Sequence, residues 1–259
     1  MACVDGEWHA LPARLLAEVL HLRGWRVDFL GAQVPTPHLV AHLHHHAPDV
    51  VALSCSIPTR LPTAHAAITA CQAAGVPVLA GGAAFGRDGR HARQLGADAW
   101  APDARAAGAR LAQEFPRMHL GASRQPIDDL PHLADQEYSL VSRSAPGLVQ
   151  STVSELADRI PAMRAYTDQQ RQHTIEDIAH IVDFLGTGLY TDDDDLFTGF
   201  IVWTAEILTA RGVPAGSLLP ALDLLAMQLK DFPRSQRLLR AAKDALSATF
   251  GPDRTGVTQ

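Results

Sequence analysis

The sequence has few of the residues that would place it in several large classes of protein. Its 259 residues include three cysteines, Cys3, Cys55 and Cys71. Three cysteines in a chain of this length predict no disulfide framework, so a reducing cytoplasm is the expected compartment. No apolar run approaches the ~20 residues of a membrane-spanning helix. The first residues also lack the basic and apolar regions of a secretory signal.

Charge and motif content exclude further classes. A net charge of −6 argues against a general nucleic-acid binder, which needs a basic surface to neutralise phosphates. The sequence contains no P-loop, no Gly-x-Ser-x-Gly, no Cys-x-x-Cys and no paired-carboxylate motif of a hydrolase. We therefore expect neither a nucleic-acid partner nor an enzyme active site.

The first half of the chain alternates short β-like runs with helical patterns. Strands are expected at residues 1–5, 25–30, 50–54, 76–80 and 99–101, and helices at 12–23, 36–46, 62–74, 91–95 and 104–114. The run at 50–54 is continuously apolar, which is typical of a strand buried on both faces. Such short connections predict right-handed βαβ units, and thus an α/β domain with a doubly wound parallel sheet over residues 1–120.

The second half has a different pattern. Periodicity fades after residue 115, and prolines and glycines predict a linker or irregular arm at residues 121–150. Residues 151–259 are expected to form an all-helical domain, since each predicted helix carries an apolar stripe. Those helices are predicted at 154–166, 174–185, 194–210, 215–230 and 234–250.

Small and polar residues follow three of the predicted strands. These residues are Glu7-Trp8-His9, Ser54-Cys55-Ser56 and Gly81-Gly82. Ligands of doubly wound sheets bind at the carboxyl ends of the strands, so the three groups should converge. A neutral imidazole such as that of His9 is a good cobalt ligand, and its other ring nitrogen is normally held by a carboxylate. Glu7 is the first candidate for that carboxylate and Asp5 the second.

The remaining members of the cluster suit a bulky ligand. Gly81 and Gly82 remove two side chains where a large ring would approach the backbone, and Ser54 and Ser56 offer hydroxyls. Each feature alone has an ordinary explanation, because a single histidine is commonly a surface residue and a glycine pair is common in α/β folds. Together, in this order, they favour a metal-cofactor pocket over the rival, a similar domain with an unrelated ligand.

Two other features have competing interpretations. The run from His42 to His46 could hold a metal, but no carboxylate is evident behind it. We interpret it as a solvated helix end, where partly protonated histidine is favourable. Cys55 could point into the cofactor pocket, although a small buried apolar role is the simpler interpretation.

Residues 1–115 resemble the cobalamin-binding domain of corrinoid proteins, which has an Asp/Glu-x-His-x-x-Gly loop, a Ser-x-Leu/Thr strip and a Gly-Gly pair. The matching residues are Glu7, His9, Ser54, Gly81 and Gly82. The resemblance implies a flavodoxin-like fold that binds cobalamin base-off, with His9 replacing dimethylbenzimidazole as the lower cobalt ligand. It also implies that the serine and glycine elements line a slot for the displaced nucleotide.

The chain departs from that pattern in two ways. Pro12 stands where the motif has glycine, which changes the turn into the first helix. The first strand is also short, because the motif lies so near residue 1; we therefore expect that the true start codon lies upstream.

The order of the two halves resembles the photocobilins, photoreceptors that combine adenosylcobalamin with biliverdin. In them a globin- or phycobilisome-like helical domain holds the bilin. The resemblance implies a cobalt–carbon bond that light breaks, a homo-oligomer whose state depends on light, and a downstream signalling protein. Arg159, His173 and Trp203 are the candidate bilin contacts, with surface charge and core packing as alternatives. Since no cysteine follows Cys71, a bilin in the helical domain should bind non-covalently.

Two alternative functions would also use a bound cobalamin. One is a corrinoid methyl carrier that serves a methyltransferase, and the other is a cobalamin-binding module without light chemistry. The sequence leaves open the upper axial ligand, the bilin contacts and the oligomeric state.

Overall fold

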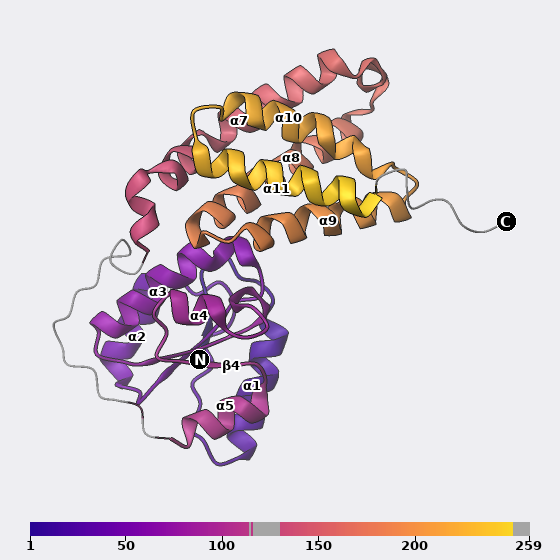
Figure 1. Ribbon diagram of the computed structural model, residues 1–259. Coiled ribbons are helices and arrows are strands. Elements are labelled where there is room, and N and C mark those ends of the chain that lie inside the picture. The colour runs from indigo at the N-terminus through magenta and orange to yellow at the C-terminus, as the bar shows by residue number, and fades with distance from the viewer. Residues whose placement is uncertain (114, 116–129, 251–259) are drawn as a thin grey trace. The chain divides into compact units, whose positions relative to one another are not determined.

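The chain consists of two compact units, Met1–His132 and Leu133–Gln259. A computed structural model describes residues 1–113, 115 and 130–250 (Figure 1). The first unit is α/β and the second is helical, as predicted. Each is described by itself.

A parallel sheet forms the centre of the first unit. Its strands are β1 (Ala2–Cys3), β2 (Val51–Ser54), β3 (Val78–Gly81) and β4 (Ala99–Ala101). They pair in the order β1-β2-β3-β4, and every pair is parallel. This agrees with the predicted parallel, flavodoxin-like sheet. The strands β2 and β3 are almost wholly buried, which explains their continuous apolar sequence.

Helices cover both faces of this sheet. They are α1 (Ala10–Leu22), α2 (Thr36–His46), α3 (Leu61–Ala73), α4 (Arg90–Gln94) and α5 (Ala104–Leu111), with short 3₁₀ turns at Pro58–Arg60 and Ala83–Phe85. In Figure 1, α1 and α5 lie together on one side, and α2 and α3 lie together on the other. A core of Leu20, Leu79, Ala101 and Leu111 joins α1 and α5 to the sheet.

The predicted strand at residues 25–30 is wrong as a regular strand. This stretch lies beside β1, since the Leu30 amide donates to the Met1 carbonyl at 2.9 Å and the Cys3 amide donates to the Gly31 carbonyl at 3.0 Å. It forms no ladder of its own because β1 is only two residues long. The alternating pattern marked the extended backbone correctly, but a strand also needs a partner of matching length.

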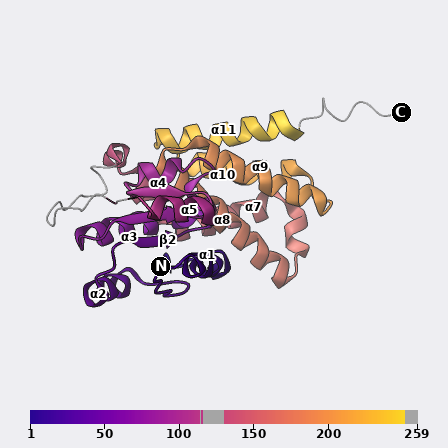
Figure 2. The same cartoon turned by 90° about the horizontal axis from the view of Figure 1, so that it is seen from below.

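The second unit is built from helices around one apolar core. They are α7 (Glu137–Arg159), α8 (Asp168–Thr191), α9 (Asp194–Ala210), α10 (Leu219–Gln228) and α11 (Pro233–Phe250), with 3₁₀ turns at Pro131–Asp135, Pro161–Ala165 and Ala215–Leu218. The helix α11 lies beside both α9 and α10 (Figure 1), and Figure 2 shows the same helices from below. Among the residues described, no helix combines the length and apolar character needed to cross a bilayer.

The predicted irregular arm at 121–150 is wrong from residue 137 onward, because α7 begins at Glu137 and the helical unit begins before residue 151. Pro146 lies inside α7, where it was expected to mark a loop. Burial of Val141 and Leu148 in the helical core outweighs the local preference. Most of the first part of the arm, residues 121–129, lies outside the described residues.

A buried carboxylate holds the start of α11. Glu137, from the first turn of α7, accepts hydrogen bonds from the backbone amides of Arg234 and Ser235, both at 2.9 Å. The Ser235 hydroxyl donates to the same carboxylate at 3.0 Å. Negative charge at a helix N-terminus is favourable, so Glu137 fixes α7 to α11.

Candidate cofactor site

The three residue groups expected to converge lie at one edge of the sheet. In the ladder, Cys3 is opposite Ser54, Ser54 is opposite Gly81, and Gly81 is opposite Ala101. The strands therefore end level with one another, and the loop that follows β1 carries Glu7 and His9 above this edge. The predicted convergence at the carboxyl ends of the strands is confirmed.

Glu7 holds the ring of His9, as their spacing predicted. The Nδ1 atom of His9 lies 2.7 Å from Oε1 of Glu7, and the His9 backbone amide donates to the same oxygen at 2.8 Å. Asp5, the second candidate, is exposed. A carboxylate at Nδ1 favours the tautomer with its proton on that nitrogen, which leaves Nε2 with a free lone pair.

Glu7 is completely buried, at 0% exposure. Its other oxygen accepts the backbone amides of Ser56 and Ile57 at 2.6 and 3.0 Å. Burial alone would raise the pKa of Glu7, but the hydrogen bonds from His9, Ser56 and Ile57 outweigh burial and lower that pKa below its ordinary value. The carboxylate is therefore ionised at neutral pH and fixed from both sides.

The imidazole of His9 faces outward from this anchor. Its side chain is 40% exposed, and within the described residues Nε2 has no hydrogen-bond partner. Trp8, which is 62% exposed, stacks on the ring with a centroid distance of 3.8 Å. The ring is thus held on one edge and one face, while Nε2 remains available to a metal.

The protein constrains the two glycines differently. Gly82 has φ +106, and a Cβ there would lie 2.2 Å from the Cys55 carbonyl oxygen, so the protein itself demands glycine. A Cβ on Gly81 would meet only the Ala101 carbonyl oxygen, at 3.4 Å. The protein therefore has room for a methyl group at position 81, where glycine keeps the strand end open.

A pocket of about 270 Å³ runs from this edge along the sheet. The ends of β2, β3 and β4 form one wall, and α1 and α5 form the other. Ser54, Gly81 and Gly82 line it, together with alanines that keep it narrow. Pro12 also lines it from the first turn of α1, where proline is tolerated because no helical hydrogen bond is lost. The departure from the motif glycine is therefore accommodated.

An apolar stripe flanks the mouth of the pocket. Leu11 and Leu15, one turn apart on α1, are 68% and 58% exposed, and Leu15 lines the pocket itself. Trp8 lies two residues before the start of the same helix. Exposed large apolar side chains grouped beside a pocket are typical of a ligand-binding surface.

Ser56 and Cys55 act mainly through their backbones. The Ser56 amide binds Glu7, and the Cys55 carbonyl accepts the Ala84 amide at 3.1 Å. The Cys55 thiol is fully buried and points to the Ile57 carbonyl. This arrangement confirms the interpretation of Cys55 as a small buried side chain.

The candidate bilin residues of the helical unit lie on different helices. Arg159 ends α7 and donates to the Met227 sulfur at 3.5 Å, His173 is exposed near the start of α8, and Trp203 is 57% exposed on α9. In the described part of the chain no hydrogen bond, ion pair or ring contact joins these three. Phe184 and Phe200 form a stacked aromatic pair, with ring centroids 3.8 Å apart. Trp203 lies 6.2 Å from Phe200 by the same measure.

Several residues of the site escaped prediction. The amides of Ser56 and Ile57 anchor Glu7, but a backbone donor leaves no mark in a sequence. Arg60 lies against Gly6, where a Cβ would come within 2.9 Å of its guanidinium carbon. Asp103 lines the pocket and caps α5 by accepting the Ala106 amide at 2.8 Å; an aspartate immediately before a helix could have revealed it.

Comparison with known proteins agrees with this geometry. Residues 1–111 match the family model described as the B12 binding domain. This match supports a cobalamin-binding domain, and hence a corrinoid cofactor, in the first unit. It does not extend into the helical unit. A search of the curated proteins found no match.

Among solved structures, the chain is similar to a cobalamin-binding protein from Desulfitobacterium hafniense DCB-2. The two share 23% identity with a TM-score of 0.40 over 43% of this chain and 55% of that one. The chain thus spans about half the length of that protein.

Proposed function

We propose that the first unit binds a cobalamin base-off, with Nε2 of His9 as the lower axial ligand of cobalt. The observation that carries this proposal is the buried Glu7 carboxylate, which holds His9 Nδ1 at 2.7 Å and leaves Nε2 facing outward. A carboxylate behind a ligating imidazole is the usual arrangement in metal sites. Cobalamin, when bound, would supply a redox-active cobalt ion with a labile upper ligand.

Other residues of the chain would hold the nucleotide and the corrin ring of the cofactor. The pocket between the sheet and α1 and α5 would hold the displaced nucleotide, since it opens at the same edge as His9. Trp8, Leu11 and Leu15 would lie against the apolar parts of the corrin. Gly81 would allow the nucleotide to pass the strand end, because no contact within the protein requires glycine there.

The test is a dark titration with adenosylcobalamin, read by absorbance and calorimetry. His9→Ala should weaken binding by at least about 10-fold, since even residues that only support a metal ligand contribute that much. His21→Ala is the matched control, because His21 is exposed on α1; it should bind like the parent protein. Equal affinity and equal spectra for His9→Ala and the parent would contradict the proposal.

A glycine comparison tests the nucleotide pocket separately. Gly81→Ala should leave the unfolding midpoint almost unchanged and weaken cobalamin binding. Cobinamide, which lacks the nucleotide, should bind the variant and the parent protein alike. If Gly81→Ala weakened both ligands equally, the pocket would not be the nucleotide site.

At a finer level, we propose a photosensor rather than an enzyme. It would act in the cytoplasm, with adenosyl as the upper ligand and biliverdin bound non-covalently by the helical unit. The partly buried Phe184 and Phe200 and the exposed Trp203 support this, because a long conjugated ligand needs an aromatic surface between helices. Light would act by removing the upper ligand, which favours a different association between copies or with a signalling partner.

Illumination tests this finer proposal. The protein should be purified in the dark with adenosylcobalamin and biliverdin, then examined by absorbance and light scattering before and after green light. A photochange with a red-absorbing bilin band and a new molecular mass is the expected result. A light-stable cobalamin that exchanges methyl groups would instead indicate a corrinoid methyl carrier, and a stable one without such exchange would indicate a storage or binding module.

A further inference from the structure

The pocket beside α1 and α5 changes in chemical character from its mouth to its inner end. Ser54 and Asp103 are the described lining residues whose side chains carry an oxygen or nitrogen atom. Ser54 is the last residue of β2, and Asp103 comes just after β4, so both lie at the carboxyl edge of the sheet. The Asp103 carboxylate also accepts the Ala106 amide at 2.8 Å. Among the described lining residues, hydrogen-bonding side chains are therefore found only at the mouth.

The floor of the pocket is apolar further in. The ladder places Ala52 opposite Leu79 and Leu79 opposite Ala99, one step of the pleat before the strand ends at Ser54 and Gly81. Residues two apart on a strand face the same side of the sheet, so Ala52 and Leu79 face the pocket as Ser54 and Gly81 do. Because parallel strands bond to their neighbours through the backbone, the floor presents mainly methyl groups to a ligand.

The opposite wall is equally apolar. Leu16 and Val19 come from the middle of α1, and Ala107 comes from the middle of α5. Both helices begin near the carboxyl edge of the sheet, so their later turns lie deeper along the pocket. Their backbone groups are hydrogen-bonded within the helices. A ligand that enters from the mouth therefore meets polar side chains first and apolar ones after them.

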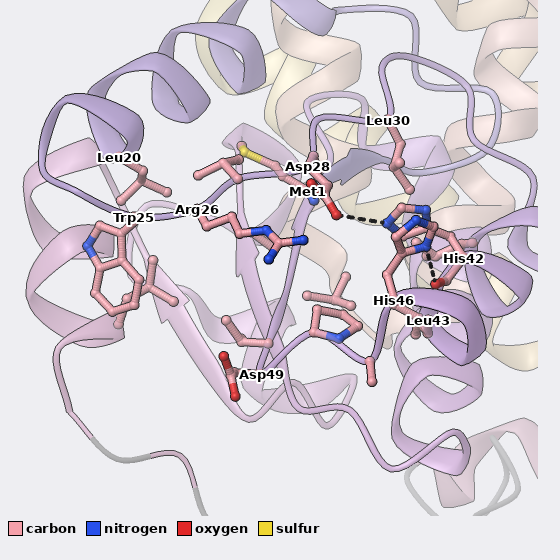
Figure 3. Close-up of a pocket in the computed structure, with 18 residues that line it drawn as sticks. Met1, Leu20, Trp25, Arg26, Asp28, Leu30, His42, Leu43, His46 and Asp49 are labelled. Carbon is pink, nitrogen blue, oxygen red and sulfur yellow. Dashed lines mark hydrogen bonds and ion pairs between the residues drawn. The ribbon is translucent and has the colours of Figure 1, made fainter.

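A second cavity of the same unit shows that this apolar character is not general. Figure 3 shows this cavity, which has a volume of about 240 Å³. Its lining includes Arg26, Asp28, His42, His46 and Asp49. None of these five described residues lines the pocket beside α1 and α5. A ligand group that needs hydrogen bonds would therefore find few partners at the inner end of that pocket.

We propose that the pocket beside α1 and α5 selects the lower base of the corrinoid, and takes an apolar benzimidazole in preference to a purine such as adenine. This selectivity rests on the proposed cobalamin binding, because the nucleotide must enter the pocket. It concerns which corrinoid the protein takes, a choice that ligation by His9 leaves open. Both bases are bicyclic rings of similar size, so the volume of about 270 Å³ does not distinguish them.

The two bases differ in their polar atoms. Dimethylbenzimidazole has two methyl groups on its outer ring, whereas adenine has an amino group and ring nitrogens. The methyl groups suit a surface made by Leu79, Val19 and Ala107, where they would leave water. Adenine would lose its hydrogen bonds to water without replacement, which is unfavourable. Since a hydrophobic pocket rejects a polar isostere by roughly 100-fold at most, we expect a preference of about 10–100-fold once each base has left the cobalt.

The experiment compares three corrinoids that share the adenosyl upper ligand, by calorimetry in the dark. They are cobalamin, the same cobamide with adenine as its base, and cobinamide, which has no base. The free ligands hold their own bases on cobalt with different strength, but this difference cancels when two proteins are compared with the same pair of ligands. The decisive quantity is therefore the change in the ratio of the two affinities between the parent protein and a variant.

Two variants add a hydroxyl to the inner end of the pocket. Val19→Thr keeps the branched shape of the side chain, and Ala107→Ser adds the hydroxyl from α5; either oxygen can accept a hydrogen bond from the adenine amino group. Val40→Thr is the matched control, because Val40 is also partly buried on a helix, α2, but lines neither cavity. The unfolding midpoint of each protein is measured alongside.

In at least one of the two pocket variants, the preference for cobalamin over the adenine analogue should fall by about 3–10-fold. Cobinamide affinity should stay within about 2-fold of the parent value, and Val40→Thr should match the parent with all three ligands. If cobinamide binds but the ratio is the same in the parent and both pocket variants, the selectivity is overturned while ligation by His9 stands. If none of the three corrinoids binds the parent, the proposed cobalamin function fails and the selectivity fails with it.

Discussion

Glu7→Gln is a small change that would disturb how the His9 ring is oriented while leaving the imidazole itself in place. The buried carboxylate accepts four hydrogen bonds, two at each oxygen. Glutamine keeps one acceptor oxygen, so its amide nitrogen must face the donors on one side. Facing Ser56 and Ile57, it would leave two backbone amides without an acceptor. Facing His9, it would leave the His9 amide unpaired and would force Nδ1 to accept a hydrogen bond.

Both outcomes have a calculable cost. A hydrogen bond to a charged group contributes ~1.5–3 kcal/mol, so the loss of two should reduce the free energy of unfolding by roughly 3–6 kcal/mol. If Nδ1 becomes the acceptor, the ring proton moves to Nε2 and blocks the lone pair proposed to bind cobalt. Changes to such supporting groups lower metal affinity ~10–100-fold.

The assay pairs urea unfolding with cobalamin titration in a double-mutant cycle. Glu7→Gln should weaken cobalamin binding in the parent protein but have less than about 2-fold further effect in His9→Ala, because Glu7 acts through His9. Glu18→Gln is the matched control: its ion pair with Arg14 is exposed and contributes little. Unchanged affinity in Glu7→Gln, or an equal loss in both backgrounds, would refute the reasoning.

Four further predictions concern stability and reactivity. Because hydrogen bonding lowers the pKa of Glu7, its contribution to the free energy of unfolding is complete above the ordinary glutamate pKa of ~4.3. That contribution should be lost as the pH falls through the lower folded value; urea titrations at several pH values should show this, and Glu7→Gln should show a flatter dependence. Gly82→Ala should lower the free energy of unfolding by at least about 2 kcal/mol, because its Cβ would meet a backbone oxygen at positive φ; a midpoint equal to that of Gly81→Ala would contradict this. Burial raises the pKa of Cys55 and Cys71 to about 12, so neither thiol should react with iodoacetamide at neutral pH until the first unit unfolds, and rapid labelling of the native protein would be the contrary result. Glu137→Gln should destabilise the helical unit by about 2–4 kcal/mol without changing cobalamin affinity, as helix circular dichroism during urea unfolding can show.

The α/β architecture could be predicted because its signals are local. The apolar run of β2 and the helical pattern of α2 each appear within one window of sequence. The stretch at 25–30 shows the limit of such signals, since its extended backbone was predicted but its pairing depends on residues that are distant in the sequence. Pro146 shows the same limit for helices, because tertiary burial outweighed a local helix breaker.

The same distinction between local and long-range signals applies to the residues of the candidate site. The contact between Glu7 and His9 follows from a two-residue spacing, and the level strand ends follow from parallel topology. In contrast, the expectation that no carboxylate lies behind the histidine run was wrong, because Asp28 lies 3.5 Å from Nε2 of His42. That contact joins an extended stretch to a helix, and only the folded chain brings the two together.

The most direct test of the account is the identity of the nitrogen on cobalt. The protein should be produced with ¹⁵N-labelled histidine, loaded with unlabelled cob(II)alamin and examined by electron paramagnetic resonance. Coordination by His9 predicts that each cobalt line splits into a doublet from ¹⁵N, and that His9→Ala loses this splitting. A triplet from ¹⁴N in the labelled protein would show that the cofactor's own base remains bound, and would contradict base-off binding through His9.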